Sequence, residues 1–381
     1  MRTRAVVASN ISSSRLPGWD ALRGLAATGV LVLHASVFRL GDLPLLRDIV
    51  SQFQCGVEVF FVVSGFVMSR PFIRAVLDGR PLPGIRRYGW RRVVRIFPAY
   101  WLALAGAALL LDTTQFRSVG DWLVHALLLQ VYWTDQYSRG IGIAWTLSVE
   151  VSFYVLLPIA FVAVRGLASR LSPWAQVTGL GVVLHLVGWC WVLWVVRGDH
   201  FLQAFWLPFF LPVFTAGLLL CVAAEYVARN PRARLLANRI GRAAPLWWLG
   251  AAGLLLIATV TIGDDALFRI GRLGETQVLY AGIATLLVIP IAIGFQPSGP
   301  IGRWLELRPL VFLGVVSYGL YLWHKQLAFF LAVDIFGWTG ETQGSALVMT
   351  VATFVLSVCV ASVSWFAIER PLQRWSRSVF R

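Results

Sequence analysis

The chain has 381 residues, of which 58% are hydrophobic and only 13% are charged. Soluble domains average about 25% charged residues, so this composition argues against a large soluble core and indicates an integral membrane protein. The net charge of +15 does not indicate nucleic-acid binding, because the 32 Arg residues lie between long apolar runs, as they do in cytoplasmic loops of membrane proteins.

Ten apolar runs are long enough to span a membrane as helices, each of which needs about 20 mostly apolar residues. The polar segment before them shows no sign of a cleaved signal peptide. The stretch 121–133 is apolar but short, and we interpret it as an interfacial or re-entrant helix. We therefore predict an all-α fold, that of a polytopic membrane protein with about ten transmembrane helices. The predicted spans are 19–39, 53–70, 93–111, 143–164, 176–197, 205–226, 244–262, 277–295, 309–333 and 345–368.

The Arg residues predict the orientation of these spans. If the N-terminus is cytoplasmic, the inner segments carry 24 Arg residues and the outer segments carry seven, which agrees with the positive-inside rule. We therefore expect a cytoplasmic tail at 1–18, a ten-helix membrane domain at 19–368 and a second cytoplasmic tail at 369–381. The expected location is the cell membrane, with both termini cytoplasmic.

The first span, which begins DALRGLAATGVLVLHA at Asp20, contains ionisable residues that are costly in hydrocarbon and are therefore functional candidates. Arg23 and His34 are eleven residues apart, which is close to three helical turns. Their side chains therefore share one face and lie about 16 Å apart along the axis. Asp20 lies near the same stripe, so Asp20 and Arg23 face the cytoplasmic mouth and His34 lies about two-thirds of the way across.

Three other ionisable residues reach the depth of His34 when the helical rise is counted from the span ends. They are Glu58 in the second span, Glu150 in the fourth and His324 in the ninth. A His beside a carboxylate can act as a general base, because the acid orients the ring and stabilises the imidazolium. The alternative is that the carboxylates make structural hydrogen bonds or lie at helix ends. For His324 and its neighbour Lys325, both interpretations are open.

Five Arg residues precede or enter the third span in the stretch RRYGWRRVVRIFPAYW, residues 86–101. Arg92 and Arg95 are three residues apart on one side of the helix, where two guanidinium groups can hold a phosphate. Together with Arg23 they form a predicted cytoplasmic anion site. The alternative is an anchor to anionic lipid, which is our interpretation of Arg86 and Arg87.

Several other polar residues are interpreted as structural. His125 and His200 lie in outer segments, and His185 is alone on an apolar helix. Ser64 and Gly65 lie in the middle of a span, where small residues allow helices to pack closely. The four Cys residues are far apart without metal-ligand spacing, so we expect no metal site and no permanently bound cofactor.

Six motifs occur in a fixed order along the chain, and as a set they are specific. They are WDALRGLAATGVLVLHA, GVEVFFVVSGFVMSR, RRVVRIFPAYWLAL, WTLSVEVSFYVLLP, LGVVSYGLYLWHKQL and the closing ERPL. Over residues 17–372 the chain resembles the integral-membrane acyltransferase family 3. Some members of that family carry an additional hydrolase-like domain, and we expect none in this chain.

The resemblance implies a ten-helix enzyme that moves an acyl group, often acetyl, from acyl-CoA to a carbohydrate hydroxyl. Acceptors in the family include envelope glycans and glycosylated natural products such as macrolides. The family's Arg-ten-residues-His motif corresponds to Arg23 and His34, its Arg-x-x-Arg motif to Arg92 and Arg95, and its upstream acid to Asp20. These four donor-side residues and His34 are the implied site.

The residue pattern and the family resemblance together give a hypothesis. In it, acyl-CoA docks from the cytoplasm and its pantetheine arm extends along the first helix towards His34. Glu58 or Glu150 orients His34, which takes a proton from the acceptor hydroxyl. Several residues remain open as oxyanion donors or acceptor contacts: Trp145, Tyr318, His324 and Lys325.

Two rival functions follow from the same residues. A proton-coupled secondary transporter could use buried His, Glu and Arg as a relay, but there is no evident internal repeat and no broken helix. A non-catalytic membrane scaffold is the other alternative. The sequence leaves open the acyl chain, the acceptor, the face from which the acceptor enters, and the oligomeric state.

Overall fold

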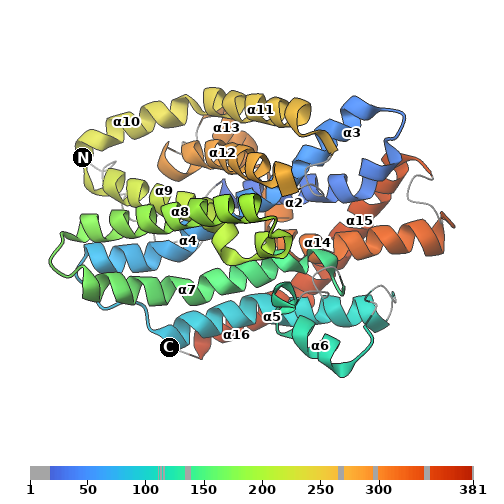
Figure 1. The fold of residues 1–381 in the computed structure, drawn as a ribbon, viewed down its shortest axis with the longest axis horizontal. Helices are drawn as coiled ribbons and strands as arrows, with labels where there is room; N and C mark the ends of the chain where they lie inside the picture. Colours follow the sequence, from blue (N-terminus) through green and yellow to red (C-terminus); the bar gives the residue numbers. More distant parts are fainter. Residues whose placement is uncertain are drawn as a thin grey trace.

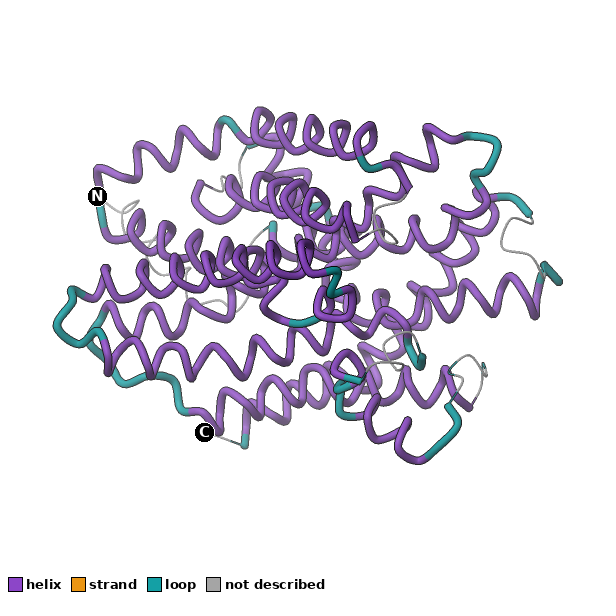
Figure 2. Tube along the Cα trace, viewed as in Figure 1, coloured by secondary structure: helices purple, strands orange, loops and turns teal. Residues whose placement is uncertain are grey.

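The structure, a computed structural model, describes residues 18–109, 116–133, 139–264, 270–294, 299–338 and 344–379, with single residues 111 and 114. Over these residues the regular secondary structure is entirely helical (Figure 2), which confirms the predicted all-α class. The predicted N-terminal tail lies, except for Gly18, outside the described residues.

A long helix occupies each of the ten predicted spans in the described part of the chain (Figure 1). They are α2 (Trp19–Ser36), α4 (Gly56–Leu77), α5 (Ile85–Leu109), α7 (Trp145–Leu167), α8 (Pro173–Gly198), α9 (Leu207–Arg229), α11 (Ala244–Thr261), α12 (Ile270–Gly294), α14 (Arg308–Phe330) and α15 (Ala346–Ser364).

Shorter elements connect these helices. Two five-residue π-helical segments extend α14 and α15, at Leu331–Ile335 and Trp365–Glu369. The 3₁₀ turns are Val37–Arg39, Gln52–Cys55, Gln130–Tyr132, Gly142–Ala144 and Phe201–Phe205. The short α-helices are α3 (Pro44–Ser51), α6 (Val119–Ala126), α10 (Pro231–Arg242), α13 (Pro300–Leu305) and α16 (Arg370–Ser378). Because α6 has eight residues, the stretch predicted at 121–133 is confirmed as too short to span.

Eight helical segments in the described residues are long and apolar enough to cross a membrane. The helices α2 and α14 fall outside this set, although both occupy predicted spans. They are also among the most closely packed pairs in the molecule. Polar residues in these two helices are therefore shielded by protein rather than exposed to lipid, which is how membrane proteins accommodate ionisable groups.

Local sequence explains where several helices begin. Ser172 caps α8 by accepting a hydrogen bond from the backbone N–H of Ala175 at 3.2 Å, and Pro173 follows at the first helical position. Asn230 and Pro231 begin α10 in the same way. Such caps satisfy backbone N–H groups that have no partner within the helix.

The helices α4 and α9 form the centre of the bundle. In the segments that contain α4 and α9, 67% of the most apolar 18-residue stretch is buried inside the protein. The corresponding share is 22% for α8, α11 and α15, which lie at the periphery. A Cβ on Gly65 would lie 2.0 Å from the carbonyl oxygen of Phe214, and one on Gly217 would lie 2.0 Å from that of Val62. The absence of side chains at both positions allows the two backbones to touch, as predicted for Gly65.

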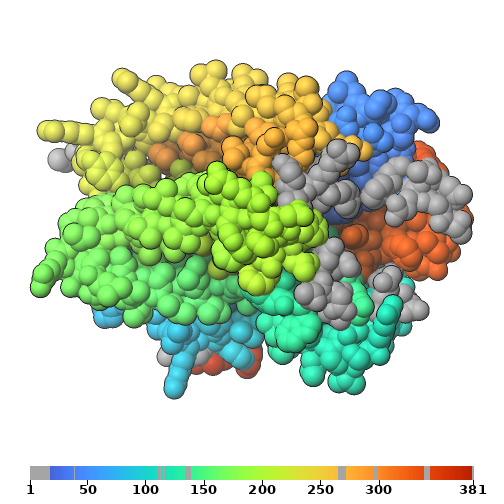
Figure 3. Space-filling model, viewed as in Figure 1, coloured from blue at the N-terminus to red at the C-terminus, as the bar shows by residue number. Residues whose placement is uncertain are grey.

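The two ends of the bundle differ in the segments that they carry (Figure 1). The turns after α4, α7 and α9 lie at one end together with α16, whereas α3 and α6 lie at the other. We call the first the arginine end, because its segments were predicted as the Arg-rich inner ones, and the second the α3–α6 end. From the side shown in Figure 3, α7 to α11 cover the middle of the molecule.

Candidate functional site

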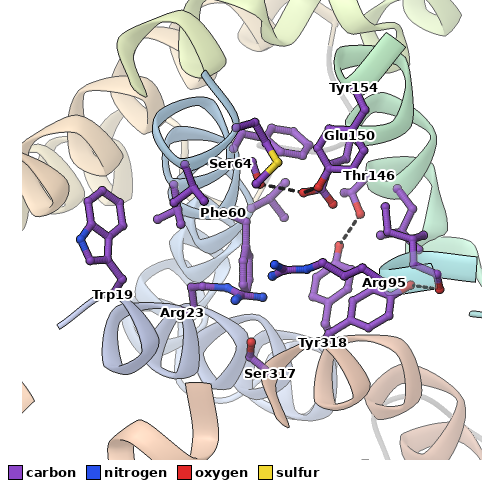
Figure 4. A pocket seen from close by; sticks show the side chains of 18 of the residues that line it. Trp19, Arg23, Phe60, Ser64, Arg95, Thr146, Glu150, Tyr154, Ser317 and Tyr318 are labelled. Atoms are coloured by element: carbon purple, nitrogen blue, oxygen red, sulfur yellow. Dashed lines mark hydrogen bonds between the residues drawn. The ribbon is translucent and has the colours of Figure 1, made fainter. Parts of the chain in front are cut away.

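A cavity, which we call the inner cavity, runs between α2, α4, α5, α7 and α14. Arg23 of α2 and Arg95 of α5 extend towards each other within it, while Ser64 and Glu150 lie on another wall (Figure 4). The remaining wall is largely aromatic and aliphatic. The residues that line the cavity include Trp19, Asp20, Arg23, Val57, Phe60, Ser64, Arg95, Thr146, Glu150, Tyr154, Ser317, Tyr318 and Tyr321.

A second cavity, the outer or arginine cavity, adjoins the inner cavity on the side of the arginine end. The two share four lining residues, Asp20, Arg23, Arg95 and Tyr318, so they meet at the paired arginines. The other wall of the second cavity consists of α16 and the π-helical segment before it. A route therefore leads from the arginine end of the bundle, past Arg23 and Arg95, into the interior.

His34 and His324 form a direct contact beyond the inner cavity. Nε2 of His324 lies 3.0 Å from Nδ1 of His34, and the ring centroids are 5.1 Å apart. Nδ1 of His324 lies 2.7 Å from the carbonyl oxygen of Tyr321. A carbonyl can only accept, so this nitrogen carries the proton. The neutral His324 ring therefore presents an unprotonated Nε2 to His34.

The same reasoning places the proton on His34. Its Nδ1 faces two acceptors, Nε2 of His324 and the carbonyl oxygen of Val30 at 2.9 Å, so Nδ1 donates in the neutral ring. Nε2 of His34 is then unprotonated, and it has no hydrogen-bond partner in the described part of the chain. A neutral imidazole with a free, unprotonated nitrogen is the form that general-base chemistry requires.

Aromatic contacts connect the inner cavity with this histidine pair. Phe60 and Tyr321 both line the cavity, and their ring centroids are 5.9 Å apart. The ring of Tyr321 lies 5.7 Å from that of His324. Arg23 and His34 are separated by eleven residues on the one continuous helix α2, which corresponds to a rise of about 16 Å. Of α2, only Trp19, Asp20 and Arg23 line the cavity, so Phe60 and Tyr321 rather than the first helix itself connect it with His34.

Neither predicted carboxylate orients His34, so that part of the hypothesis is corrected. Glu150 lines the cavity and accepts hydrogen bonds from Ser64 Oγ at 2.7 Å and from the Tyr154 hydroxyl at 2.5 Å. Glu58 is buried, and its Oε2 has no hydrogen-bond partner among the described residues. The imidazole of His324 occupies the place on the His34 ring where we expected a carboxylate.

The predicted pair of arginines on α5 divides between two environments. Arg95 lines both cavities described above. The guanidinium of Arg92 lies over the rings of Tyr88 and Tyr154, at 5.9 and 5.8 Å, and lines a separate apolar hollow. Three residues advance a helix by 300°, so the two side chains point about 60° apart. Tyr154 lines both the cavity that contains Arg95 and the hollow that contains Arg92.

The other predicted contacts lie in different surroundings. Trp145 packs against Phe205 and Phe210 and does not line the cavity. The Tyr318 hydroxyl donates to the carbonyl oxygen of Ile96 at 2.8 Å, while its ring lines both cavities. Lys325 is exposed on α14.

The three histidines interpreted as structural have local partners. Nδ1 of His125 lies 2.8 Å from the carbonyl oxygen of Asp121, and Nδ1 of His185 lies 2.9 Å from the hydroxyl of Thr215. His200 stacks on a neighbouring Trp ring. None of the three lines either cavity.

Several cavity residues were missed by the sequence analysis. The Tyr321 hydroxyl lies 3.1 Å from Oγ1 of Thr146, and Tyr154 holds Glu150. One signal was available for Tyr321, since it precedes His324 by three residues and therefore lies on a nearby face of the same helix. For Thr146 and Tyr154 the sequence offers no comparable signal, because their relevance depends on how α7 is rotated.

Comparisons with known proteins agree with the motifs. The family model described as "Acyltransferase domain" matches residues 16–366. The chain is 23% identical to O-acetyltransferase OatA of Staphylococcus aureus strain NCTC 8325 / PS 47, and equally so to OatA of strain COL. Each match covers 94% of this chain but 57% of the relative, so the chain spans little more than half the length of these proteins. No solved structure matches it. Because the family model covers nearly all of its length, the chain belongs to acyltransferase family 3.

Proposed function

We propose that this protein is a membrane-bound O-acyltransferase that moves an acetyl group from acetyl-CoA to a carbohydrate hydroxyl. One observation carries the proposal: a cavity that opens among arginines leads to Tyr321, which touches the His324–His34 pair. The similar proteins are named O-acetyltransferases, which supports acetyl as the group and oxygen as the acceptor atom. The acceptor would be an envelope glycan or a glycosylated natural product such as a macrolide.

The donor would enter from the arginine end. Arg23 and Arg95 face each other across the shared part of the two cavities, and guanidinium pairs suit phosphate oxygens. The acyl arm of the thioester would then extend along α2 towards His34, over the rise of about 16 Å between Arg23 and His34. Asp20, on the same wall, balances part of the positive charge when the site is empty.

The transfer step would use Nε2 of His34 as the base. This nitrogen removes the proton of the acceptor hydroxyl while the oxygen forms a bond to the thioester carbonyl carbon. The C–S bond then breaks, and the departing thiolate takes the proton back from Nε2. During the step Nε2 of His324 accepts a hydrogen bond from Nδ1–H of His34, which stabilises the imidazolium. The products are an ester and free CoA.

The acceptor would approach from the α3–α6 end. His34 lies in the last turn of α2, and the chain continues from there to α3. Donor and acceptor would therefore meet from opposite ends of the bundle, which favours an acceptor outside the cytoplasm, such as an envelope glycan. Both tyrosine hydroxyls donate to backbone carbonyls, but the bond of Tyr321 to Ile143 is long, at 3.5 Å, whereas that of Tyr318 to Ile96 is 2.8 Å. Because Tyr321 also touches His324, we propose that Tyr321 rather than Tyr318 stabilises the oxyanion.

Replacing His34 tests this function directly. In membranes supplied with acetyl-CoA labelled in the acetyl group, we expect His34→Ala to lower acetyl transfer to extracted glycans by about 10² to 10⁴-fold. The matched control is His185→Ala, another histidine of a long helix that lines neither cavity. It should retain most of the activity at equal protein abundance.

Two results would contradict the proposal. Full acetyl transfer by correctly folded His34→Ala protein would remove the base. An absence of any acyl product from the wild-type protein, together with pH-coupled movement of a solute in vesicles, would instead support the transporter alternative.

A further inference from the structure

The helix α16 forms a wall of the outer, arginine-side cavity. Arg370, Arg374 and Arg377 of this helix all line it, opposite Arg23 and Arg95. Their spacing of four and three residues places them on one face of the helix, over a length of about 10 Å. Five arginines therefore surround this space, with Asp20 and Glu369 as the acids that line it.

Two features fix α16 against this cavity. The π-helical segment Trp365–Glu369 changes the winding of the chain between α15 and α16, and it directs α16 onto α5. The ring of Trp375 packs edge to face on that of Trp90 in α5, with centroids 5.5 Å apart. Glu369, at the end of the π-helical segment, is buried and accepts a hydrogen bond from Ser364. The row of arginines is thus held by packing.

These arginines are not held in ion pairs within the part of the chain that the structure describes, although Asp20 and Glu369 line the same cavity. Within the described residues, none of the five has a carboxylate within 4.0 Å of its guanidinium. At the same end of the bundle, by contrast, Arg70, Arg74 and Arg229 all bind the carboxylate of Glu225. Three arginines of α16 are exposed at the mouth of the cavity, where a ligand from solution can reach them.

We infer that α16 binds the nucleotide part of the acyl-CoA donor, with Arg370, Arg374 and Arg377 contacting its phosphate groups while Arg23 and Arg95 receive the end that leads into the pantetheine arm. The inference rests on the proposed function and names residues that extend its donor site. A row of cations about 10 Å long suits a ligand with several separated phosphates. Acyl-CoA is such a ligand, because it carries a diphosphate and a separate ribose phosphate.

An anionic lipid headgroup offers the same phosphate chemistry, but the geometry favours the nucleotide. The space between α16 and α5 continues past Arg23 and Arg95 into the interior of the bundle. A lipid headgroup bound at the membrane surface would not enter this inner space. A thioester donor, by contrast, must extend its acyl arm through the inner space to reach His34. The charged face of α16 and the inner cavity therefore belong to one elongated site.

The experiment uses the full-length protein in detergent and measures CoA binding by titration calorimetry. The test variant is Arg374→Gln/Arg377→Gln. The control is Arg232→Gln/Arg303→Gln, which removes the same charge from exposed positions that line neither cavity. We expect the test variant to weaken CoA binding by about tenfold or more, since each lost contact is a charged hydrogen bond. The control should bind as the wild type does, and both variants should show unchanged thermal unfolding midpoints.

Donors that lack parts of the nucleotide sharpen the result. Turnover of acetyl-pantetheine, which has no phosphate, should be equal in the wild type and the test variant. Titration with dephospho-CoA should show a smaller difference between the two proteins than titration with CoA, because one phosphate contact is already missing. Rescue of CoA binding by Arg374→Lys/Arg377→Lys to within a fewfold of the wild type would support a charge-based contact.

The possible negative results distinguish failure of the α16 inference from failure of the proposed function. If the wild-type protein binds CoA and the test variant binds it equally well, the role of α16 is overturned while the proposed function stands. If the wild type binds no CoA at all, both proposals fail. If the two proteins differ only in retaining added phosphatidylglycerol, α16 is a lipid site and the inference is wrong.

Discussion

The contact between His34 and His324 makes the position of the His34 proton depend on the backbone carbonyl that His324 faces. Tyr321 holds the proton on Nδ1 of His324, and Nε2 of that ring then requires His34 to donate from Nδ1. The free Nε2 of His34 follows from these two contacts. His324 is therefore a positioning residue, which acts on the acceptor only through His34.

This arrangement predicts different effects for two substitutions of His324. The amide oxygen of Gln can replace Nε2 as an acceptor, so His324→Gln should retain roughly a tenth or more of the kcat for acetyl transfer. His324→Phe fills the space without an acceptor, and we expect kcat to fall by about 10²-fold. The KM for acetyl-CoA should change little in either variant, because the arginines lie at the other end of α2. Steady-state kinetics in membranes would separate these parameters, and a raised KM with an unchanged kcat would contradict the role.

Glycines set the distance between the two helices that carry this pair. A Cβ on Gly314 would lie 1.8 Å from the carbonyl oxygen of Asp20, and one on Gly24 would lie 2.7 Å from the backbone nitrogen of Gly314. The helices α2 and α14 therefore touch through their backbones near the arginine end. The same helices bring His34 and His324 together about three turns away.

We expect Gly314→Ala to force α2 and α14 apart and to reduce both acetyl transfer and the thermal unfolding midpoint. Gly253→Ala is the matched control, because Gly253 also lies inside a long helix but a Cβ there meets nothing within 4 Å. That control should be neutral or slightly stabilising, since Ala favours helix over Gly. Equal midpoints for the two variants would show that the α2–α14 contact tolerates a side chain.

A buried carboxylate joins α4 to α9 at the arginine end. Glu225 is 2% exposed and binds Arg70 and Arg74 at 3.0 and 2.7 Å, together with Arg229. Arg229 also binds Asp78, and hydrogen bonds from Arg229 and Arg80 lower the pKa of that carboxyl. Asp78 therefore stays ionised, and it stabilises the fold until the pH falls through its lowered pKa.

Removing the charge of Glu225 should destabilise the protein strongly. Glu225→Gln would leave three guanidinium groups together without their shared anion, and loss of one partner of a buried pair costs about 3–5 kcal/mol. The partly exposed arginines place the expected value near 3 kcal/mol. Glu275→Gln breaks the exposed pair with Arg272 and should cost less than about 1 kcal/mol. Thermal unfolding in detergent compares the two, and a smaller loss for Glu225→Gln would contradict the argument.

The helices could be predicted from the sequence because their lengths depend on local apolar runs and on the thickness of a bilayer. The shared face of Arg23 and His34 could also be predicted, since both lie on one continuous helix. Counting depth correctly indicated His324, but it indicated Glu58 and Glu150 equally. Depth does not determine how a helix is rotated or which helices are neighbours, and the His34–His324 bond joins residues 290 positions apart.

The same limit explains what was missed at the arginine end. Arg92 and Arg95 were correctly recognised as neighbours on α5, yet a difference of about 60° sends one to the cavity and the other to Tyr88 and Tyr154. The arginines of α16 were counted only for their effect on topology. Their spacing over 370–377 is that of one helical face, but no local pattern shows that this face packs against α5.

The placement of donor and acceptor rests on the orientation of the whole bundle in the membrane. The turn at 78–84 lies at the arginine end, and α3 lies at the other. The excess of Arg in the predicted inner segments argues that the arginine end faces the cytoplasm, where acyl-CoA is made. Because Arg23 and His34 lie towards opposite ends of α2, this orientation decides which substrate comes from which side.

Labelling of single cysteines tests that orientation. With the exposed Cys190 and Cys359 replaced by Ala, we expect Leu45→Cys on α3 to react with a membrane-impermeant maleimide in intact cells. Gly79→Cys is a poor choice because Gly79 has a positive φ of 64°, so Arg80→Cys serves as the partner site and should react only after permeabilisation. The reverse pattern would place Arg23, Arg95 and α16 outside the cytoplasm. A cytoplasmic thioester could then not reach the arginine cavity, and the donor assignment would fall even if His34 proved essential.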